Sequence, residues 1–187
     1  FRYFEESDLK DKKLQCTTTV DPAIGKGKEA NNSVVRTVGK ERDKPNWYLI
    51  EESAGRMDPL QLIDAIFYHQ QKYRSVVWLE TIAYQQALKY FIEEEQRRRQ
   101  IYFLVNELKR NKDTQKETRI RGLIPLYKAG VIFHRRSDVE LEKEALQFPK
   151  GRLDDRLDAL ADQLEAVENT ADEKPYKQAK YEPRTKY

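Results

Sequence analysis

Acidic residues stand at three places in the sequence where carboxylates could work together. Asp21 ends a run of alternating residues, Glu80 ends the apolar run VVWLE, and three aspartates crowd the stretch GRLDDRLDAL at 151–160. Like charges three or four residues apart on a helix repel one another, so this last group needs an explanation. Either the carboxylates cap the start of a helix, or a cation sits among them.

The crowded stretch contains Asp154, Asp155 and Asp158, and spacing alone does not choose among them. At about 100° per residue, Asp154 and Asp158 lie beside each other at one border of the apolar stripe. Asp155 sits further round, although a side chain in a first turn can still reach inward. Free backbone N–H groups and the helix dipole favour aspartate at a helix start, so one or two of the three have a purely structural explanation.

Two strands that would position these acids are indicated by their residue patterns. Residues 14–21, LQCTTTVD, alternate between two faces, and residues 76–80 form a short apolar run typical of a strand buried on both faces. Ligands of open α/β sheets gather at the carboxyl ends of strands. If the two strands are neighbours, Asp21 and Glu80 project from adjacent tips, and the helix start at Asp154 could complete an oxygen-only site for Mg²⁺ or Mn²⁺. Two such ions can activate a water and stabilise the leaving oxygen of a phosphodiester.

The other expected elements alternate between strands and helices. SVVRTVG and WYLIEE form a hairpin, and a helix begins at Pro59 with Asp58 as its N-cap and Gln61 in a capping box. The remaining expected elements are a helix from Ala83 with Leu88, Phe91 and Ile92 on its buried face, a strand at 101–105, a helix carrying Ile120, Leu123, Ile124 and Tyr127 and stopped by Gly130, a strand VIFH, a short helix around Leu141, and a last helix from Asp154 through Val167. The order predicts an α/β fold, a mixed sheet with helices on both faces.

Composition limits the classes of protein to which the chain could belong. Its 187 residues, 39% hydrophobic and 36% charged, suffice for one domain with a sizeable core. No apolar run approaches the roughly 18 residues of a membrane span, and no secretory signal is present. The single cysteine, Cys16, excludes an internal disulfide framework. The first residue is Phe1 and the only methionine is Met57, so we expect a fragment of a longer protein.

The positions of the basic residues, more than the net charge of the chain, suggest that it could bind nucleic acid. A formal net charge of +3 does not indicate a protein that holds nucleic acid by charge alone. Basic residues nevertheless flank the acids: Lys26 and Lys28 follow Asp21, and Lys150 and Arg152 precede the aspartates. These four side chains could receive backbone phosphates, although separate basic clusters are also typical of solvated faces.

Five segments of the chain match one known family in combination: FRYFEE, DPAIGKGKEANNSVV, VVWLE, RIRGLIPLYKAGVIF and DDRLDALADQL. Together they resemble the C-terminal nuclease domain of tailed-bacteriophage large terminase subunits, and the resemblance covers roughly Phe1 to Val167. It implies a ribonuclease-H-like fold. It also implies a metal-dependent endonuclease that cleaves double-stranded viral DNA during genome packaging, with Mg²⁺ or Mn²⁺ in a two-metal site.

The resemblance also assigns site residues. The family's first metal-binding aspartate matches Asp21, its central acid matches Glu80, and its late acidic pair matches Asp154 and Asp155. Asp155 is the better candidate for direct metal contact, so Asp21, Glu80 and Asp155 are the expected catalytic carboxylates. Asp158 matches the later aspartate of the motif and would lie behind these ligands.

The same resemblance implies a domain organisation and partners. Residues 1–169 would form the nuclease domain, with 1–12 as the junction to a packaging ATPase domain, and 170–187 would be a flexible tail. The expected partners are double-stranded DNA, the ATPase domain of the same polypeptide, the capsid portal and the small terminase subunit, in the host cell cytoplasm and without a membrane. Many members read His-Asp-Asp where this chain has Leu153, which counts against a histidine-assisted step.

Two other functions remain open at this point. One is a different ribonuclease-H-like DNA enzyme, such as a junction resolvase or a transposase core, which would prefer branched DNA or transposon ends. The other is a non-catalytic module that docks to the portal or the motor, in which the acids only cap and solvate the fold.

Overall fold

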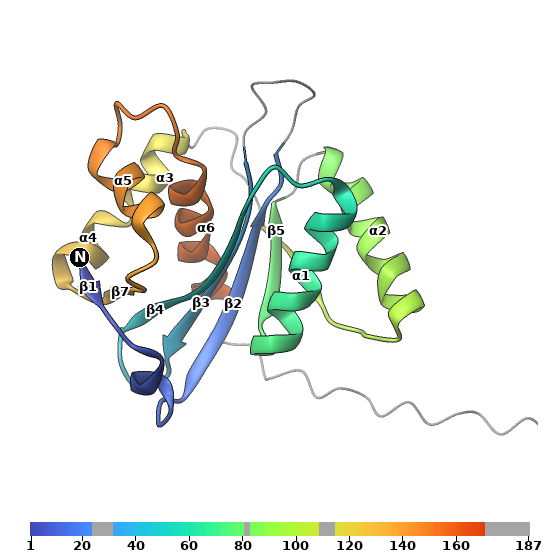
Figure 1. Ribbon diagram of the computed structural model, residues 1–187, viewed down its shortest axis with the longest axis horizontal. Coiled ribbons are helices and arrows are strands. Elements are labelled where there is room, and N and C mark those ends of the chain that lie inside the picture. Colours follow the sequence, from blue (N-terminus) through green and yellow to red (C-terminus); the bar gives the residue numbers. More distant parts are fainter. Residues whose placement is uncertain (24–31, 81–82, 109–114, 171–187) are drawn as a thin grey trace, which may run out of the picture.

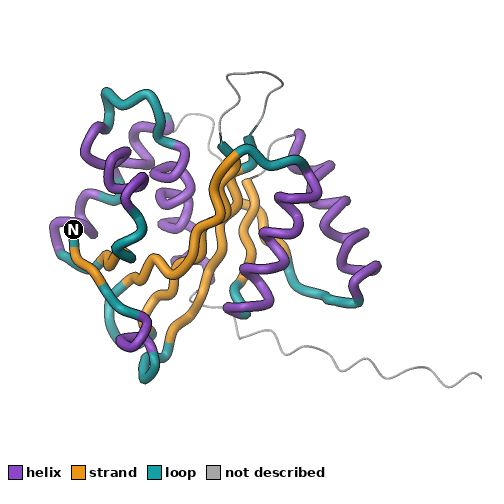
Figure 2. Tube along the Cα trace, in the orientation of Figure 1, coloured by secondary structure: helices purple, strands orange, loops and turns teal. Residues whose placement is uncertain are grey.

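A seven-stranded mixed sheet forms the centre of the molecule, with helices on both faces (Figures 1 and 2). The computed structural model describes residues 1–23, 32–80, 83–108 and 115–170. The strands are β1 (Arg2–Tyr3), β2 (Leu14–Asp21), β3 (Ser33–Glu41), β4 (Trp47–Gly55), β5 (Val76–Glu80), β6 (Val105–Leu108) and β7 (Ile132–His134). Their order across the sheet is β1-β7-β4-β3-β2-β5-β6. The predicted mixed α/β sheet is confirmed.

Strand direction divides the sheet into an antiparallel centre and parallel flanks. β2, β3 and β4 are antiparallel to one another, so the hairpin predicted from SVVRTVG and WYLIEE is confirmed. β5 lies parallel to β2, and β6 lies parallel to β5. On the other side β7 pairs with β4, and β1, which the sequence patterns did not indicate, pairs with β7, both in parallel.

The helices form two layers (Figure 1). α1 (Pro59–Tyr73) and α2 (Ala83–Arg99) cover one face of the sheet. α3 (Lys116–Arg121), α4 (Ile124–Ala129), α5 (Val139–Gln147) and α6 (Asp155–Thr170) lie on the other side, where α6 packs directly on β2 and β3. A short 3-10 helix, η1, spans Glu6–Leu9.

The central strand β2 is buried on both faces, and its alternating pattern explains why. Val20 packs into the apolar cluster beneath α1 and α2, while the hydroxyl of Thr18 lies 2.6 Å from that of Ser75 on the same side. On the opposite face Thr17 and Thr19 bond to α6. Small β-branched residues fit between two helical layers because they pack on the pleat and keep a polar atom available.

The start of α1 follows the capping pattern read from the sequence. The Asp58 carboxylate accepts from the backbone N–H of Gln61 at 2.9 Å, and the Gln61 side chain accepts from the backbone N–H of Asp58 at 2.9 Å. Pro59 occupies the first turn, where its missing N–H costs nothing. The buried stripe of this helix includes Leu62, Ile63, Ile66 and Phe67, as expected.

The strand expected at 101–105 was placed too early. β6 begins at Val105, because Val77–Glu80 of β5 pair with 105–108. The apolar residues before it are held by the end of α2: the backbone N–H of Ile101 donates to the Gln96 carbonyl, and the Gln96 side chain donates to the Phe103 carbonyl at 2.8 Å. Phe103 alone of the aromatic pair Tyr102 and Phe103 is buried, so the run is not buried on both faces.

Two expectations about the helices were also wrong. The single helix expected through Ile120 and Tyr127 is two helices, α3 and α4, because Pro125 has no N–H to donate to the carbonyl four residues earlier. Gly130 ends α4 in a left-handed conformation, as expected. In α2, Leu88 and Ile92 are buried but Phe91 is exposed, since this outer helix buries a narrower stripe than the spacing suggested.

The carboxyl-terminal end of the described chain is anchored. Thr170, placed by the sequence at the start of the tail, is the last residue of α6, and its hydroxyl accepts from the Trp78 indole at 2.8 Å. The rest of the expected tail, 171–187, lies outside the described residues.

Candidate functional site

The packing of α6 on β2 brings Asp21 opposite Asp155. Thr17 bonds to the side chain of Gln163, and Thr19 donates to the Ala159 carbonyl at 2.8 Å. Two residues along a strand and four along a helix both advance the chain by roughly 6–7 Å. Moving two residues toward the end of β2 therefore corresponds to moving four residues toward the start of α6. The next pair in this register is Asp21 with Asp155. The strand end and the helix start therefore meet at one end of the fold, the top in Figure 1.

Glu80 reaches the same end from the neighbouring strand. β2 and β5 are parallel, and the last pair in their register is Val20 with Leu79, so the next residues are Asp21 and Glu80. Trp78 points to the α6 face, where its indole bonds to Thr170, and Glu80 follows two residues later on that face. Glu80 is 9% exposed. The expectation that the two strands are neighbours is confirmed.

Asp155 is a buried carboxylate in the first turn of α6. It is 5% exposed, and its Oδ2 accepts the backbone N–H of Asn32 at 3.1 Å, just before β3. Among the described residues, no lysine or arginine nitrogen lies within 4.0 Å of this carboxylate. A buried carboxylate with so little neutralisation is costly unless a cation joins it.

The other two aspartates are paired with cations from α3. Lys116 Nζ lies 2.8 Å from Asp154 Oδ1 and 3.4 Å from Asp158 Oδ2, and Arg119 Nη2 donates to Asp158 Oδ1 at 2.5 Å. The carboxylate of Asp154 thus bonds to a lysine rather than to a helix N–H, although its backbone carbonyl does accept from the N–H of Asp158. The backbone carbonyl of Asp154 thus accepts a helical hydrogen bond, while its side chain does not cap the helix.

Electrostatics tie Lys116 to the strand end as well as to the helix. Burial alone would lower the pKa of Lys116, but the hydrogen bond that it donates to Asp154 and the charges of Asp158, Asp154 and Asp21 outweigh this effect, so the pKa is raised. The lysine therefore stays charged at neutral pH. It lies in the combined field of carboxylates from β2 and α6.

The free N–H groups of α6 are capped from a different helix. Glu144 of α5, 6% exposed, accepts from the backbone N–H groups of Arg156 at 2.9 Å and Leu157 at 3.1 Å. Burial is the largest influence on the Glu144 carboxyl and raises its pKa, although these two N–H groups and the Arg156 charge act the other way. A buried carboxylate aimed at a helix start satisfies donors that the aspartates leave unbonded.

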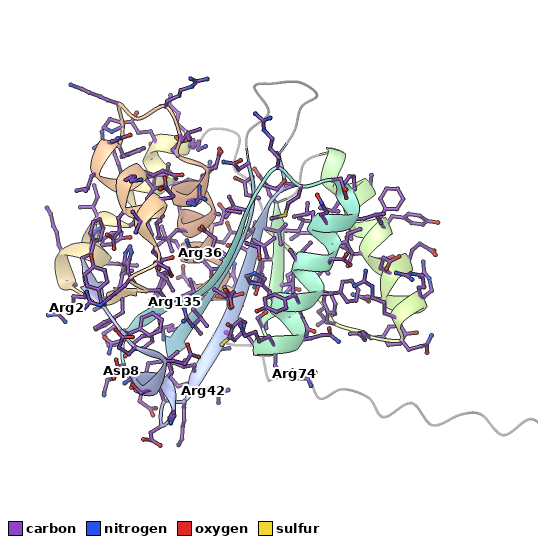
Figure 3. The ribbon with its side chains drawn as sticks, viewed as in Figure 1. Arg2, Asp8, Arg36, Arg42, Arg74 and Arg135 are labelled. Carbon is purple, nitrogen blue, oxygen red and sulfur yellow. The ribbon has the colours of Figure 1, made fainter. Side chains whose placement is uncertain are left out.

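A chain of ion pairs continues from that cap into the sheet. The Arg156 side chain pairs with Glu144 and, at 2.8 Å, with Glu52 of β4. Glu52 in turn pairs with Arg36 of β3, which is fully buried and also bonds to Asp138 at 3.1 Å. Figure 3 shows Arg36 on the sheet face toward α5 and α6. The network holds the start of α6, and with it Asp155, against the central strands.

The basic residues proposed to bind phosphate divide into two groups. Lys150 and Arg152 are exposed on the segment that leads into α6, close in sequence to Asp154. Lys26 and Lys28 lie outside the described residues.

The donor set suits a hard cation, since Asp21, Glu80 and Asp155 offer only carboxylate oxygens. Within the described part of the chain, however, no three His, Cys, Asp or Glu side chains form a group that could hold a metal as they are placed. Lys116 and Arg119 instead form ion pairs with the carboxylates of Asp154 and Asp158. Neither of these two cations forms an ion pair with Asp155.

Three contributors to the site were missed by the sequence reasoning. Lys116 and Arg119 precede the residues used to predict the helix at Ile120 and were given no role, although their spacing of three puts both on one face of a helix. Glu144 had no local signal, because its partners lie on another helix.

Comparison with known proteins identifies the fold. No family model matches the sequence, and no curated protein matches it. Among solved structures, the human cytomegalovirus terminase nuclease domain is similar, with a TM-score of 0.58 and 14% identity over 90% of this chain and 89% of that one. The chain therefore has a ribonuclease-H-like fold of the kind found in a terminase nuclease domain. In the described residues no helix is both long and apolar enough to cross a membrane.

Proposed function

We propose that the chain is a metal-dependent endonuclease that cleaves double-stranded DNA. The observation that carries this proposal is the convergence of Asp21, Glu80 and Asp155 at one end of the sheet, on a fold similar to a terminase nuclease domain. Carboxylates from two parallel strand ends and one helix start form an oxygen-rich centre of the type that phosphodiester hydrolysis requires. The likeness supports the fold, and the carboxylates support the chemistry.

Asp21, Glu80 and Asp155 would hold Mg²⁺ or Mn²⁺, with Asp154 and Asp158 released to assist when their lysine and arginine partners move. Two such ions supply an activated water and stabilise charge on the leaving oxygen. The protein's own contribution is to hold the carboxylates in place. Asn32 orients Asp155 through its backbone N–H, and Glu144 fixes the helix start on which Asp155 stands.

More specifically, the chain would be the nuclease domain of a tailed-bacteriophage terminase, acting in genome packaging in the host cytoplasm. The resemblance of the segments around Asp21, Glu80 and Asp155 supports it, and the similar viral domain is compatible with it. Its partners would be double-stranded DNA, an ATPase domain of the same polypeptide, the capsid portal and the small terminase subunit. Lys150 and Arg152, exposed beside the aspartates, would receive DNA phosphates there, together with Lys26 and Lys28.

The test is nicking of supercoiled plasmid in Mn²⁺, Mg²⁺ or EDTA. Wild-type protein should nick in either metal and not in EDTA. Asp21→Asn and Asp155→Asn should each lower the rate at least about 100-fold, the usual scale for losing one group that stabilises developing charge. Asp43→Asn, an exposed aspartate near the β3–β4 turn, is the matched control and should retain full activity.

Nicking that persists in EDTA, or in Asp155→Asn, would overturn the metal assignment. Absence of nicking by wild-type protein in both metals, together with no metal-induced rise in melting temperature, would favour a docking module instead. Faster cleavage of four-way junctions than of linear duplex would point to a resolvase.

A further inference from the structure

Two cations from α3 lie over the acidic centre in an arrangement that bears on DNA binding. Lys116 and Arg119 stand three residues apart, and both side chains point to the start of α6. Between them they contact Asp154 and Asp158 at 2.5–3.4 Å. Both cations are partly exposed to solvent: the side chain of Lys116 is 38% exposed and that of Arg119 is 23% exposed. Of the two aspartates, the Asp158 carboxylate is buried and the Asp154 carboxylate is 36% exposed.

The position of these two cations differs from that of the structural ion pairs of the molecule. Arg36, which ties the sheet to the α5 side, is fully buried and bonded to two carboxylates. Arg121, on the same short helix as Lys116, pairs with its own neighbour Glu117 and faces solvent. Lys116 contacts Asp154 and Asp158, and the charge of Asp21 acts on it as well. Its partners are the acids that the proposed metal ions would draw toward themselves.

Divalent ions and ammonium or guanidinium groups compete for the same carboxylate oxygens, because like charges at a few ångströms repel strongly. A metal ion entering beside Asp155 would therefore weaken the hold of Asp154 and Asp158 on the two side chains. A DNA phosphate offers those side chains a new anion at the same rim. Charge-assisted bonds from lysine and arginine to phosphate are short and strong, and arginine can bind phosphate through two N–H groups at once.

We propose that Lys116 and Arg119 are phosphate-binding residues for double-stranded DNA, and that they exchange aspartate partners for the DNA backbone when the acids take up metal. The inference rests on the proposed nuclease function. In the free protein the two cations neutralise the aspartates, and in the complex they position the backbone beside Asp155. Metal binding and DNA binding then assist each other through a shared pair of side chains.

The experiment uses Lys116→Met, with Arg121→Met as the matched control on the same helix. Calorimetry without DNA measures the dissociation constant for Mn²⁺. Removal of one positive charge beside the acids should tighten it about tenfold or more, which is the scale on which a nearby charge shifts an ionisation. Fluorescence anisotropy with a duplex in Ca²⁺, over a range of salt, measures phosphate contacts. The slope of log K against log salt should shrink by about 0.9 for one lost contact.

Lys116→Arg should restore the salt slope, since charge is kept, and Arg121→Met should change neither quantity. Weaker Mn²⁺ binding by Lys116→Met, or an unchanged salt slope, would overturn the inference and leave Lys116 as a tie between α3 and α6. A loss of melting temperature in Lys116→Met without tighter Mn²⁺ binding would do the same. These outcomes are separable from the nuclease proposal, which stands or fails on whether wild-type protein nicks plasmid with metal.

Discussion

The hydroxyl of Thr19 donates to the backbone carbonyl of Ala159 at 2.8 Å, and this bond sets the register between the central strand and the last helix. Because β2 and α6 run in opposite directions, the register carries Asp21 to the start of α6. The same hydroxyl accepts from the Gln163 side chain at 3.0 Å, and Gln163 also bonds to the Arg36 carbonyl. A strand end and a helix start far apart in sequence are thus held together by hydrogen bonds one turn away from the acids.

Thr19→Val should therefore lower both stability and activity. The substitution keeps the shape but leaves the Ala159 carbonyl and the Gln163 amide with one partner fewer in a buried layer. We expect the free energy of unfolding in urea to fall by about 1–3 kcal/mol, the cost of an unsatisfied buried group. Thr118→Val, at an exposed position on α3, should change it by less than about 0.5 kcal/mol. Equal stability of Thr19→Val and wild type would show that the register is set elsewhere.

Asp155 and Asp158, two of the three buried aspartates of α6, should respond oppositely in metal-free protein. Asp158 pairs with both Arg119 and Lys116, so Asp158→Asn should lower the free energy of unfolding by about 1–3 kcal/mol. Asp155 is buried without such a cation among the described residues, so Asp155→Asn should leave stability unchanged or raise it by up to about 1 kcal/mol.

Added Mn²⁺ separates the roles of these aspartates further. Mn²⁺ should raise the melting temperature of wild type and not that of Asp155→Asn, as measured by differential scanning fluorimetry. If Asp155→Asn is the more destabilising change in metal-free protein, Asp155 is a structural residue and its assignment as the metal ligand is wrong.

The fully buried Arg36 should be among the residues most sensitive to substitution. It joins Glu52 and Asp138, and its loss would leave both carboxylates short of a partner inside the fold. Breaking a buried pair by removing one side usually costs about 3–5 kcal/mol. Arg36→Met should show a loss of that size in urea unfolding, whereas Arg97→Met, an exposed arginine on α2, should lose less than about 1 kcal/mol. Similar losses for the two variants would contradict this interpretation of the network.

Two buried histidines should make the fold sensitive to mild acid. Burial lowers the pKa of His69 and of His134 to about 4, and both rings are fully buried. In the unfolded chain each ring titrates near pH 6.5, so below that pH the unfolded state binds protons that the folded state does not. The free energy of unfolding should then fall by about 2 kcal/mol for each ring between pH 6.5 and 5. Above pH 7 the rings should contribute no pH dependence.

Urea unfolding at a series of pH values measures this loss. His69→Gln, compared with wild type over the same series, should reduce the loss by roughly half, since one of two rings remains. A free energy of unfolding that stays constant from pH 6.5 to 5 would show that the folded protein accepts these protons.

Much of the framework could be predicted because its signals are local. The alternation of LQCTTTVD and the apolar run VVWLE placed β2 and β5 with the bounds that the structure has, and Asp58, Pro59 and Gln61 placed the start of α1. Side-chain alternation and helix capping depend on residues within one turn or two steps of each other. The strand expected at 101–105 failed because its position depends on pairing with β5, which is a long-range relation.

The site divides in the same way. The sequence by itself determined that Asp21 and Glu80 stand at strand ends and that three aspartates crowd a helix start. It left open which aspartate would cap the helix, and tertiary structure decided this: Glu144 from α5 caps α6, Asp154 and Asp158 bond to α3, and Asp155 stays buried without a cation among the described residues. These partners come from other helices, and only their packing on one sheet brings them within bonding distance.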